Sequence, residues 1–84
     1  MRVPYRERII LSETEFIDID IKETSEGIKF SLVLIRNNKR LVGFDNHEKH
    51  KPHKHVKNKV YDYDFVDIYK LIEDFYKEIE RWIK

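Results

Sequence analysis

All four histidines of this sequence fall within nine consecutive residues, and their spacing could support proton-transfer chemistry. They are His47, His50, His53 and His55, and five lysines lie among them or directly after them: Lys49, Lys51, Lys54, Lys57 and Lys59. Imidazole exchanges protons near neutral pH, and an ammonium group attracts anions. The segment is therefore predicted to face an anionic substrate.

Cleavage of RNA without a metal ion would use these residue types. One imidazole takes the proton of the 2′-hydroxyl, a second protonates the leaving oxygen, and a cation holds the charge on phosphorus. In an extended segment His53 and His55 share one side, with their side chains about 6–7 Å apart. The cations that could bind nucleic acid are Arg36, Arg40, Lys49, Lys51, Lys54, Lys57 and Lys59.

Two other interpretations fit the same residues. Neutral imidazoles of His47, His50, His53 and His55 could bind a divalent transition metal such as zinc, nickel or copper, with Asp45 as a further ligand. The neighbouring lysines oppose a dication, so the leading interpretation needs no cofactor. The segment could also be an exposed basic loop that holds nucleic acid or a partner protein without catalysis.

The charge of the chain is concentrated around the histidines. The net charge is only +1, but residues 36–59 carry eight Lys or Arg and two acids, whereas the rest of the chain carries nine basic and fourteen acidic groups. A basic centre in an otherwise acidic chain favours a local site for an anion such as a phosphate backbone.

Length and composition predict one domain over residues 1–84. The chain contains no cysteine, so neither disulfides nor a thiolate zinc site are expected. No apolar run approaches the roughly 20 residues that a membrane-spanning helix needs. A cytoplasmic protein without a membrane partner is the expectation.

Strands are predicted within residues 5–45. Residues 15–22 alternate, with isoleucines on one side and charged residues on the other, which indicates a strand with one exposed face. A turn over residues 24–27 would pair Ile21 with Phe30, and the Asn37–Asn38 turn would place Leu41 beside Leu34 and Val42 beside Val33. Residues 5–12 are a weaker strand candidate.

A helix is predicted over about residues 64–83, capped by Asp62 or Asp64. Apolar residues recur there at helical spacing: Phe65, Ile68, Ile72, Phe75, Ile79 and Trp82. The stripe would cover the sheet, and it is wide enough to contact a second copy in a homodimer. The expected fold is α+β, a three- to four-stranded antiparallel β-meander packed against one long C-terminal amphipathic helix, with residues 46–59 as a basic loop that could hold a short strand near residues 53–56.

The segments Phe44-Asp45-Asn46-His47 and Pro52-His53-Lys54-His55-Val56 resemble the TumE-like family of small toxin–antitoxin proteins. The matching positions are Asp45, Asn46, His53 and His55, while His47 and His50 fall where the family pattern is looser. The resemblance implies a toxin component that is encoded beside a DNA-binding antitoxin, usually of the helix-turn-helix type.

The residues and the resemblance together lead to one hypothesis. The chain acts on RNA, with His53 and His55 as the proton-transfer pair and His47 and His50 as further candidates. Asp45 orients one imidazole, and Asn46 supplies a hydrogen bond. Lys54 or Arg40 contacts the phosphate.

Overall fold

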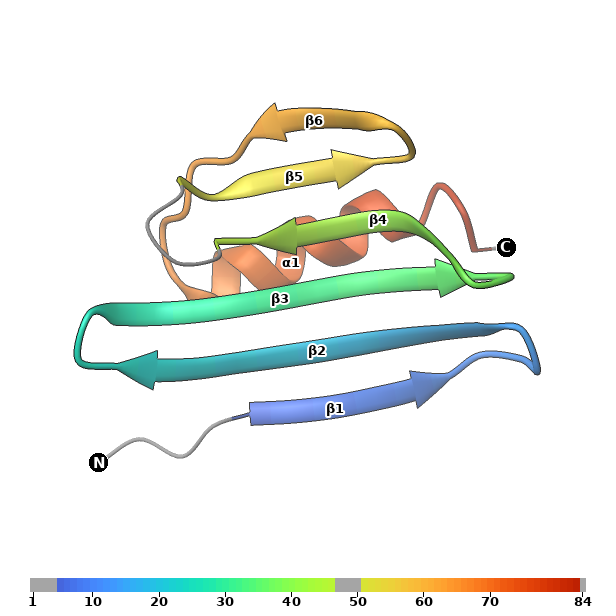
Figure 1. Ribbon diagram of the computed structural model, residues 1–84, viewed down its shortest axis with the longest axis horizontal. Helices are drawn as coiled ribbons and strands as arrows, with labels where there is room; N and C mark the ends of the chain where they lie inside the picture. The colour runs from blue at the N-terminus through green and yellow to red at the C-terminus, as the bar shows by residue number, and fades with distance from the viewer. Residues whose placement is uncertain (1–4, 47–50, 84) are drawn as a thin grey trace.

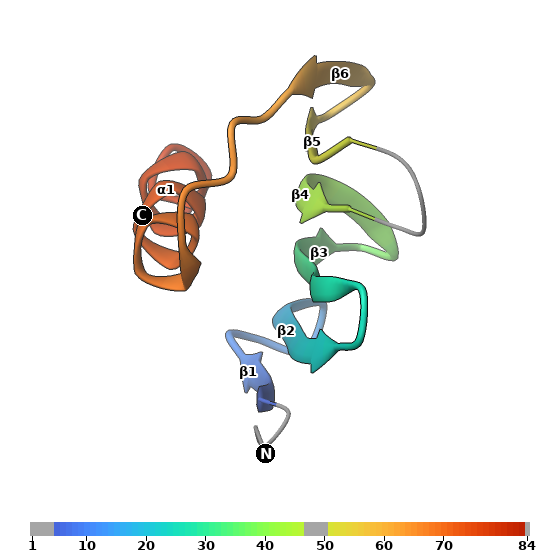
Figure 2. The same ribbon diagram turned by 90° about the vertical axis from the view of Figure 1, so that its left-hand side faces the viewer.

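The chain folds into a six-stranded antiparallel sheet with one helix against one face (Figures 1 and 2). The computed structural model describes residues 5–46 and 51–83. The elements in chain order are β1 (Tyr5–Ile10), β2 (Glu15–Thr24), β3 (Gly27–Arg36), β4 (Lys39–Asp45), β5 (His53–Val56), β6 (Lys59–Asp62) and α1 (Ile68–Ile79). Their order in the sheet is their order in the chain, so the sheet is a simple meander.

The α+β class is confirmed, but the expected number of three or four strands is wrong. Strand β1 forms within residues 5–12, the weaker strand candidate. The predicted basic loop contains the β5–β6 hairpin. Lys57 adopts a left-handed conformation with φ 54° and closes this hairpin. The short strand expected near residues 53–56 is confirmed as β5, whereas β6 is hard to recognise in the sequence because it has only four residues and few of them are apolar.

The predicted register of β2 and β3 is confirmed, whereas that of β3 and β4 is wrong by one residue. Ile21 pairs with Phe30, as the isoleucine pattern requires. Leu34, however, pairs with Val42, and Ile35 pairs with Arg40. Leu41 is therefore the extra residue of a β-bulge, which changes the face on which each later β4 side chain lies.

The helix begins later than predicted. Asp67 is its N-cap, and the Asp67 side chain accepts a hydrogen bond from the backbone N–H of Lys70 at 2.8 Å. Asp62 and Asp64 do not cap it, because Asp62 ends β6 and residues up to Asp67 connect that strand to the helix. Within the described residues, α1 is too short and too polar to span a membrane.

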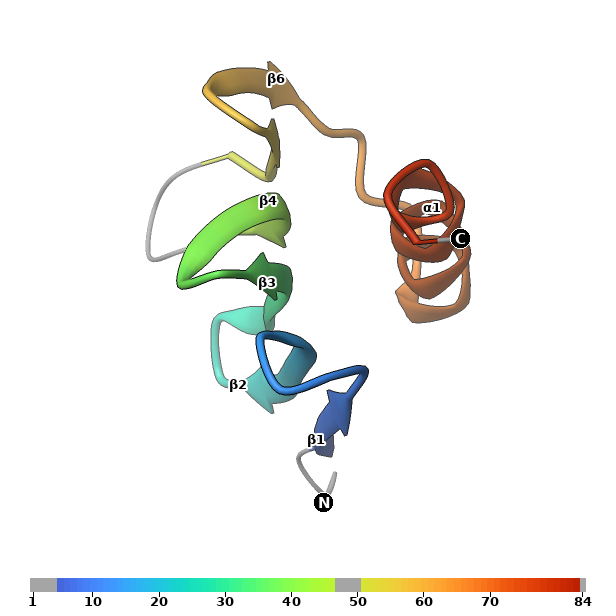
Figure 3. The same ribbon diagram turned by 90° about the vertical axis from the view of Figure 1, so that its right-hand side faces the viewer.

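The core lies between α1 and the face of the sheet that the helix covers (Figure 3). Phe44 is at its centre, with edge-on ring contacts to Phe75 of the helix and to Tyr63. The remaining buried core side chains come from the inward positions of β2, β3, β4 and the helix: Ile17, Ile19, Ile21, Phe30, Leu32, Leu34, Val42, Leu71 and Ile79. The opposite face of the sheet, which we call the open face, carries no helix among the described elements.

Phe75→Ala should lower the free energy of unfolding by about 3–5 kcal/mol, because it leaves a cavity at the centre of the core. Tyr69→Ala is the matched control, since Tyr69 is 86% exposed on the same helix and should change stability by no more than about 0.5 kcal/mol. Urea denaturation followed by circular dichroism measures both. Similar losses in the two variants would contradict this description of the core.

Candidate active site on the open face of the sheet

The two histidines of the His-x-His motif lie on the open face together with Asp45. Residues paired across an antiparallel sheet share a face, and Asp45 pairs with His53 while Gly43 pairs with His55. Phe44, between Gly43 and Asp45, points into the core. Alternation along β4 therefore sends Asp45 to the side away from the helix.

The geometry places an acid beside each imidazole. Nε2 of His55 lies 3.4 Å from Oδ2 of Asp45, and Nε2 of His53 lies 4.0 Å from Oδ1 of Asp62. The two ring centroids are 6.4 Å apart, within the range expected from the spacing alone. The side chains of His55 and Asp45 are only 19% and 14% exposed, whereas that of His53 is 30% exposed.

The surroundings of His55 favour its neutral form. Burial lowers the pKa of the His55 imidazole, and the positive charge of Arg40 lowers this pKa further. Asp45 opposes the shift through its charge and a hydrogen bond, without reversing it. A neutral imidazole at pH 7 can accept a proton, so His55 has the character of a general base.

Arg40 is the candidate cation that the structure brings to the histidines. It pairs with Ile35 in β3, before the bulge, and it lies near enough for its charge to act on His55. Arg40 is exposed, so its guanidinium is accessible to an anion.

Three other predicted cations are held by the fold away from the histidine pair. Nζ of Lys54 lies 3.0 Å from Oε2 of Glu78 on the helix, because Lys54 alternates with the histidines and points to the covered face. Nζ of Lys57 lies 4.9 Å from the ring centroid of Trp82. Arg36 binds the carboxylate of Glu15 and the backbone carbonyl of Trp82.

The remaining predicted cations and histidines divide into two groups. Lys51 and Lys59 are exposed, at the start of the β5 segment and in β6. His47, Lys49 and His50 lie outside the described residues.

Asn46 has a position different from the one expected for a catalytic amide. Its side-chain oxygen accepts a hydrogen bond from the backbone N–H of Phe30 at 2.9 Å, and its side-chain nitrogen donates to the carbonyl of Ile28 at 2.7 Å. The side chain thus continues the pairing of β3 beyond the end of β4. Both of these side-chain hydrogen bonds of Asn46 go to the backbone of β3 and not to the histidine pair.

Metal binding would need ligands beyond this cluster. Across residues 5–46 and 51–83, no three His, Asp or Glu side chains come together in a way that could hold a metal ion. A site built from the predicted histidines would therefore need His47 or His50.

Asp62 lies beside His53, although the sequence predicts Asp62 only as a candidate helix cap. The local sequence around Asp62 does not indicate that it ends a strand. Its pairing with His53 across β5 and β6 depends on the hairpin, and no local motif around Asp62 indicates it.

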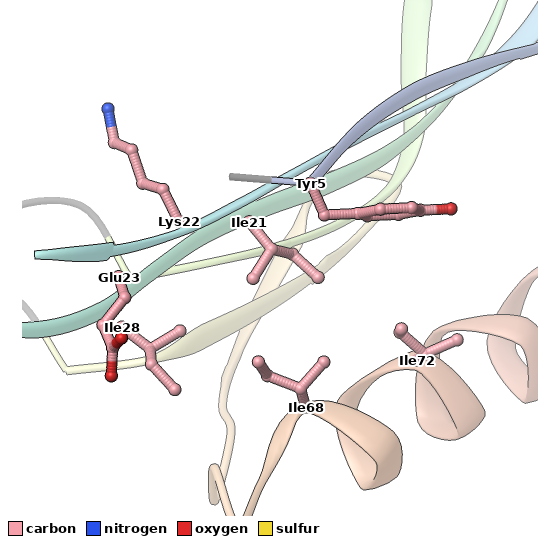
Figure 4. A pocket seen from close by; sticks show the side chains of 7 residues that line it. All are labelled: Tyr5, Ile21, Lys22, Glu23, Ile28, Ile68 and Ile72. Atoms are coloured by element: carbon pink, nitrogen blue, oxygen red, sulfur yellow. The ribbon is translucent and has the colours of Figure 1, made fainter. Parts of the chain in front are cut away.

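A pocket of 460 Å³ lies on the other side of the sheet. It opens between the start of α1, the start of β1, the end of β2 and the start of β3. Ile68 and Ile72 point into it from the helix, opposite Ile21, while the Lys22 side chain points away (Figure 4). The pocket is mainly apolar and separate from the histidine pair.

Comparison with known proteins agrees with the resemblance seen in the sequence. A family model described as "Toxin TumE" matches residues 2–83, which is nearly the whole chain. No curated protein and no solved structure matches.

Asp45→Asn should lower the pKa of His55 further, because the carboxylate is the group that raises it. NMR titration of the imidazole resonances measures the change, with Asp20→Asn on β2 as a control that should leave His55 unaffected. An unchanged or raised His55 pKa in the Asp45 variant would contradict the assigned contact.

The lowered pKa of His55 in the native protein should also make stability depend on pH. The unfolded chain, with an ordinary histidine pKa of about 6.5, binds protons before the folded chain does. The His55 contribution to the free energy of unfolding should therefore decrease as the pH falls from about 6.5 towards the folded-state pKa. The Asp45→Asn variant should extend this decrease to lower pH.

Asn46→Ala should lower the free energy of unfolding by about 1–3 kcal/mol, because it leaves backbone groups of β3 without their partners. Asn58→Ala, at an exposed turn position, should change it by no more than about 0.5 kcal/mol. Urea denaturation compares the two. Unchanged stability in Asn46→Ala, with lost activity, would instead favour a direct catalytic role.

Proposed function

Because this chain belongs to the TumE toxin family, we propose that it is the toxin of a toxin–antitoxin module and that it cleaves RNA with His53 and His55. The observation that carries the RNA-cleaving part is the pair of imidazoles 6.4 Å apart on one face, with Asp45 against one ring and Arg40 nearby. This arrangement supplies a base, an acid and a cation from side chains alone.

The proposed reaction assigns one task to each group. Asp45 accepts a hydrogen bond from Nε2–H of His55, which leaves Nδ1 of that ring as a proton acceptor. His55 removes the proton of the 2′-hydroxyl, and the 2′-oxygen attacks phosphorus. The bond to the 5′-oxygen breaks as protonated His53 donates its proton to that oxygen, giving a 2′,3′-cyclic phosphate and a 5′-hydroxyl.

The charge that develops on phosphorus needs a fixed cation. Arg40 suits this task because a guanidinium binds phosphate oxygens through two N–H groups. Asp62 lies on the other side of His53 and is in position to hold that ring when it is protonated.

The partners follow from the same proposal. Membership of a toxin family implies an antitoxin, and we propose a helix-turn-helix protein encoded beside this chain. The proposal places both proteins in the cytoplasm, where RNA is available. A homodimer stays a prediction that light scattering of the purified chain can check.

A binding module without catalysis is the second candidate function. The exposed Lys51 and Lys59 favour it, because they offer charge to a phosphate backbone without any chemistry. Such a protein would retain RNA uncut, and its affinity would fall steeply as the salt concentration rises.

The test compares the native chain with His53→Ala, His55→Ala and the double variant. Each single change should reduce RNA cleavage by about 10²–10⁴-fold, and the double variant should lose little more, because the two groups act in one reaction. Growth after induced expression is measured in parallel, with and without the neighbouring helix-turn-helix protein.

Lys22→Ala provides the control, since it removes a cation from the same face on β2, three strands away from the histidine pair on β5, and should preserve cleavage. Equal RNA turnover and equal growth inhibition by the native chain and the double histidine variant would refute the catalytic assignment.

A further inference from the structure

Gly43 occupies a position where the backbone does not require glycine. It lies in the interior of β4 and is buried, and glycine in a strand interior costs roughly 0.5–1 kcal/mol relative to alanine. Among the described glycines only Gly27 has a positive φ. The conformation of Gly43 is therefore one that an alanine could adopt, and another constraint must explain the glycine.

The constraint is the path of the Arg40 side chain. A Cβ atom built on Gly43 would lie 2.8 Å from Cδ of Arg40, 3.4 Å from Nε of Arg40 and 3.5 Å from Cγ1 of Val33. The Arg40 side chain thus lies directly over the Gly43 backbone, in the space that any other residue would fill.

The direction of this path matters because His55 is the cross-strand partner of Gly43. Gly43 faces His55 across the strand pair and has no side chain, so the Arg40 side chain can occupy the space beside His55. The bulge at Leu41 contributes as well, since it puts both Arg40 and Gly43 on the open face although they are three residues apart.

We infer that Gly43 is a positioning residue, whose missing side chain lets Arg40 cross β4 to the side of His55. The contact itself follows from the geometry alone. Its use, to hold a phosphate beside the base, rests on the proposed function. The chemical class of ligand is then a phosphodiester whose oxygens bind the Arg40 guanidinium while its 2′-hydroxyl faces His55.

Few other charges of the described residues act at this position. Within residues 5–46 and 51–83, the charged and titratable groups that act on His55 are Arg40 and Asp45 from β4 and His53 from its own strand. The cross-strand partner of His55 in β6 is the apolar Val60. A change in the position of Arg40 should therefore be visible in the titration of His55.

The test is a double-mutant cycle with Gly43→Ala, Arg40→Gln and both together, followed by NMR titration of His55. Gly43→Ala should raise the His55 pKa, because it moves the cation away, and Arg40→Gln should raise it by removing the cation. In the presence of Arg40→Gln, the alanine should have little further effect. Additive shifts, or a Gly43→Ala variant with the native pKa, would overturn the inference.

A second double-mutant cycle measures stability and does not require the protein to cleave RNA. Gly43→Ala should lower the urea midpoint of the native chain, whereas Gly43→Ala in an Arg40→Ala background should leave it equal or raise it, because the crowding has been removed. An equal loss in both backgrounds would show that Arg40 is not the group that Gly43 accommodates.

Cleavage assays then separate this inference from the proposed function. If the native chain cleaves RNA, Gly43→Ala should reduce the rate by on the order of 100-fold, as misplacement of a catalytic group by about 1 Å does. Full cleavage activity in Gly43→Ala would overturn the inference that the contact between Gly43 and Arg40 is used in cleavage. If the native chain does not cleave RNA, the proposed function fails, while both cycles still decide whether Gly43 positions Arg40.

Discussion

The arrangement of this protein depends on the alternation of side chains across a single sheet and on the bulge at Leu41 that interrupts it. Regular pairing after the Asn37–Asn38 turn would place Leu41 opposite Leu34 and would turn Asp45 towards the core. Because Leu41 is an extra residue, Leu34 faces Val42 instead, and Phe44 enters the core while Asp45 reaches the open face. Asp45 lies on the same face as His55 because the alternation of side chains along β4 is shifted at Leu41.

The sheet thereby separates a face packed against the helix from the open face, and the side chains of the basic segment are divided between the two faces. The sequence shows a cluster of cations, but alternation sends Lys54 to Glu78 on the helix, and Arg36 is held by Glu15 and by the carbonyl of Trp82. Arg40 lies close enough to act on the charge of His55. Local charge in the sequence therefore indicates a basic region, while the sheet determines which of its cations lie near the histidine pair.

The sequence was most informative where burial is strong and periodic. Isoleucines on alternate positions of β2 determine its pairing with β3, because a slip by one residue would expose all of them. The helix stripe was equally clear, although its start was not, since Phe65 packs against the core from outside the helix. The sequence indicates a possible short strand near residues 53–56, where β5 forms, but it indicates neither the bulge nor β6, because a single extra residue and a four-residue strand leave little periodic pattern. The position of Asp62 beside His53 depends on β6 and is not indicated for the same reason.

The two short motifs acquire different meanings once they are placed on the sheet. In His-x-His the two histidines are two residues apart on one strand, so the side chains of His53 and His55 lie next to each other on the same face. In Asp45-Asn46 the residues are adjacent, and their side chains have separate tasks. Asp45 contacts His55, whereas Asn46 replaces a backbone partner for β3 and so fixes the end of the strand that carries Asp45. The asparagine thus anchors the end of β4 without contacting His55, and the two adjacent residues of the motif have different contacts: Asp45 contacts His55, and Asn46 holds the strand that carries Asp45.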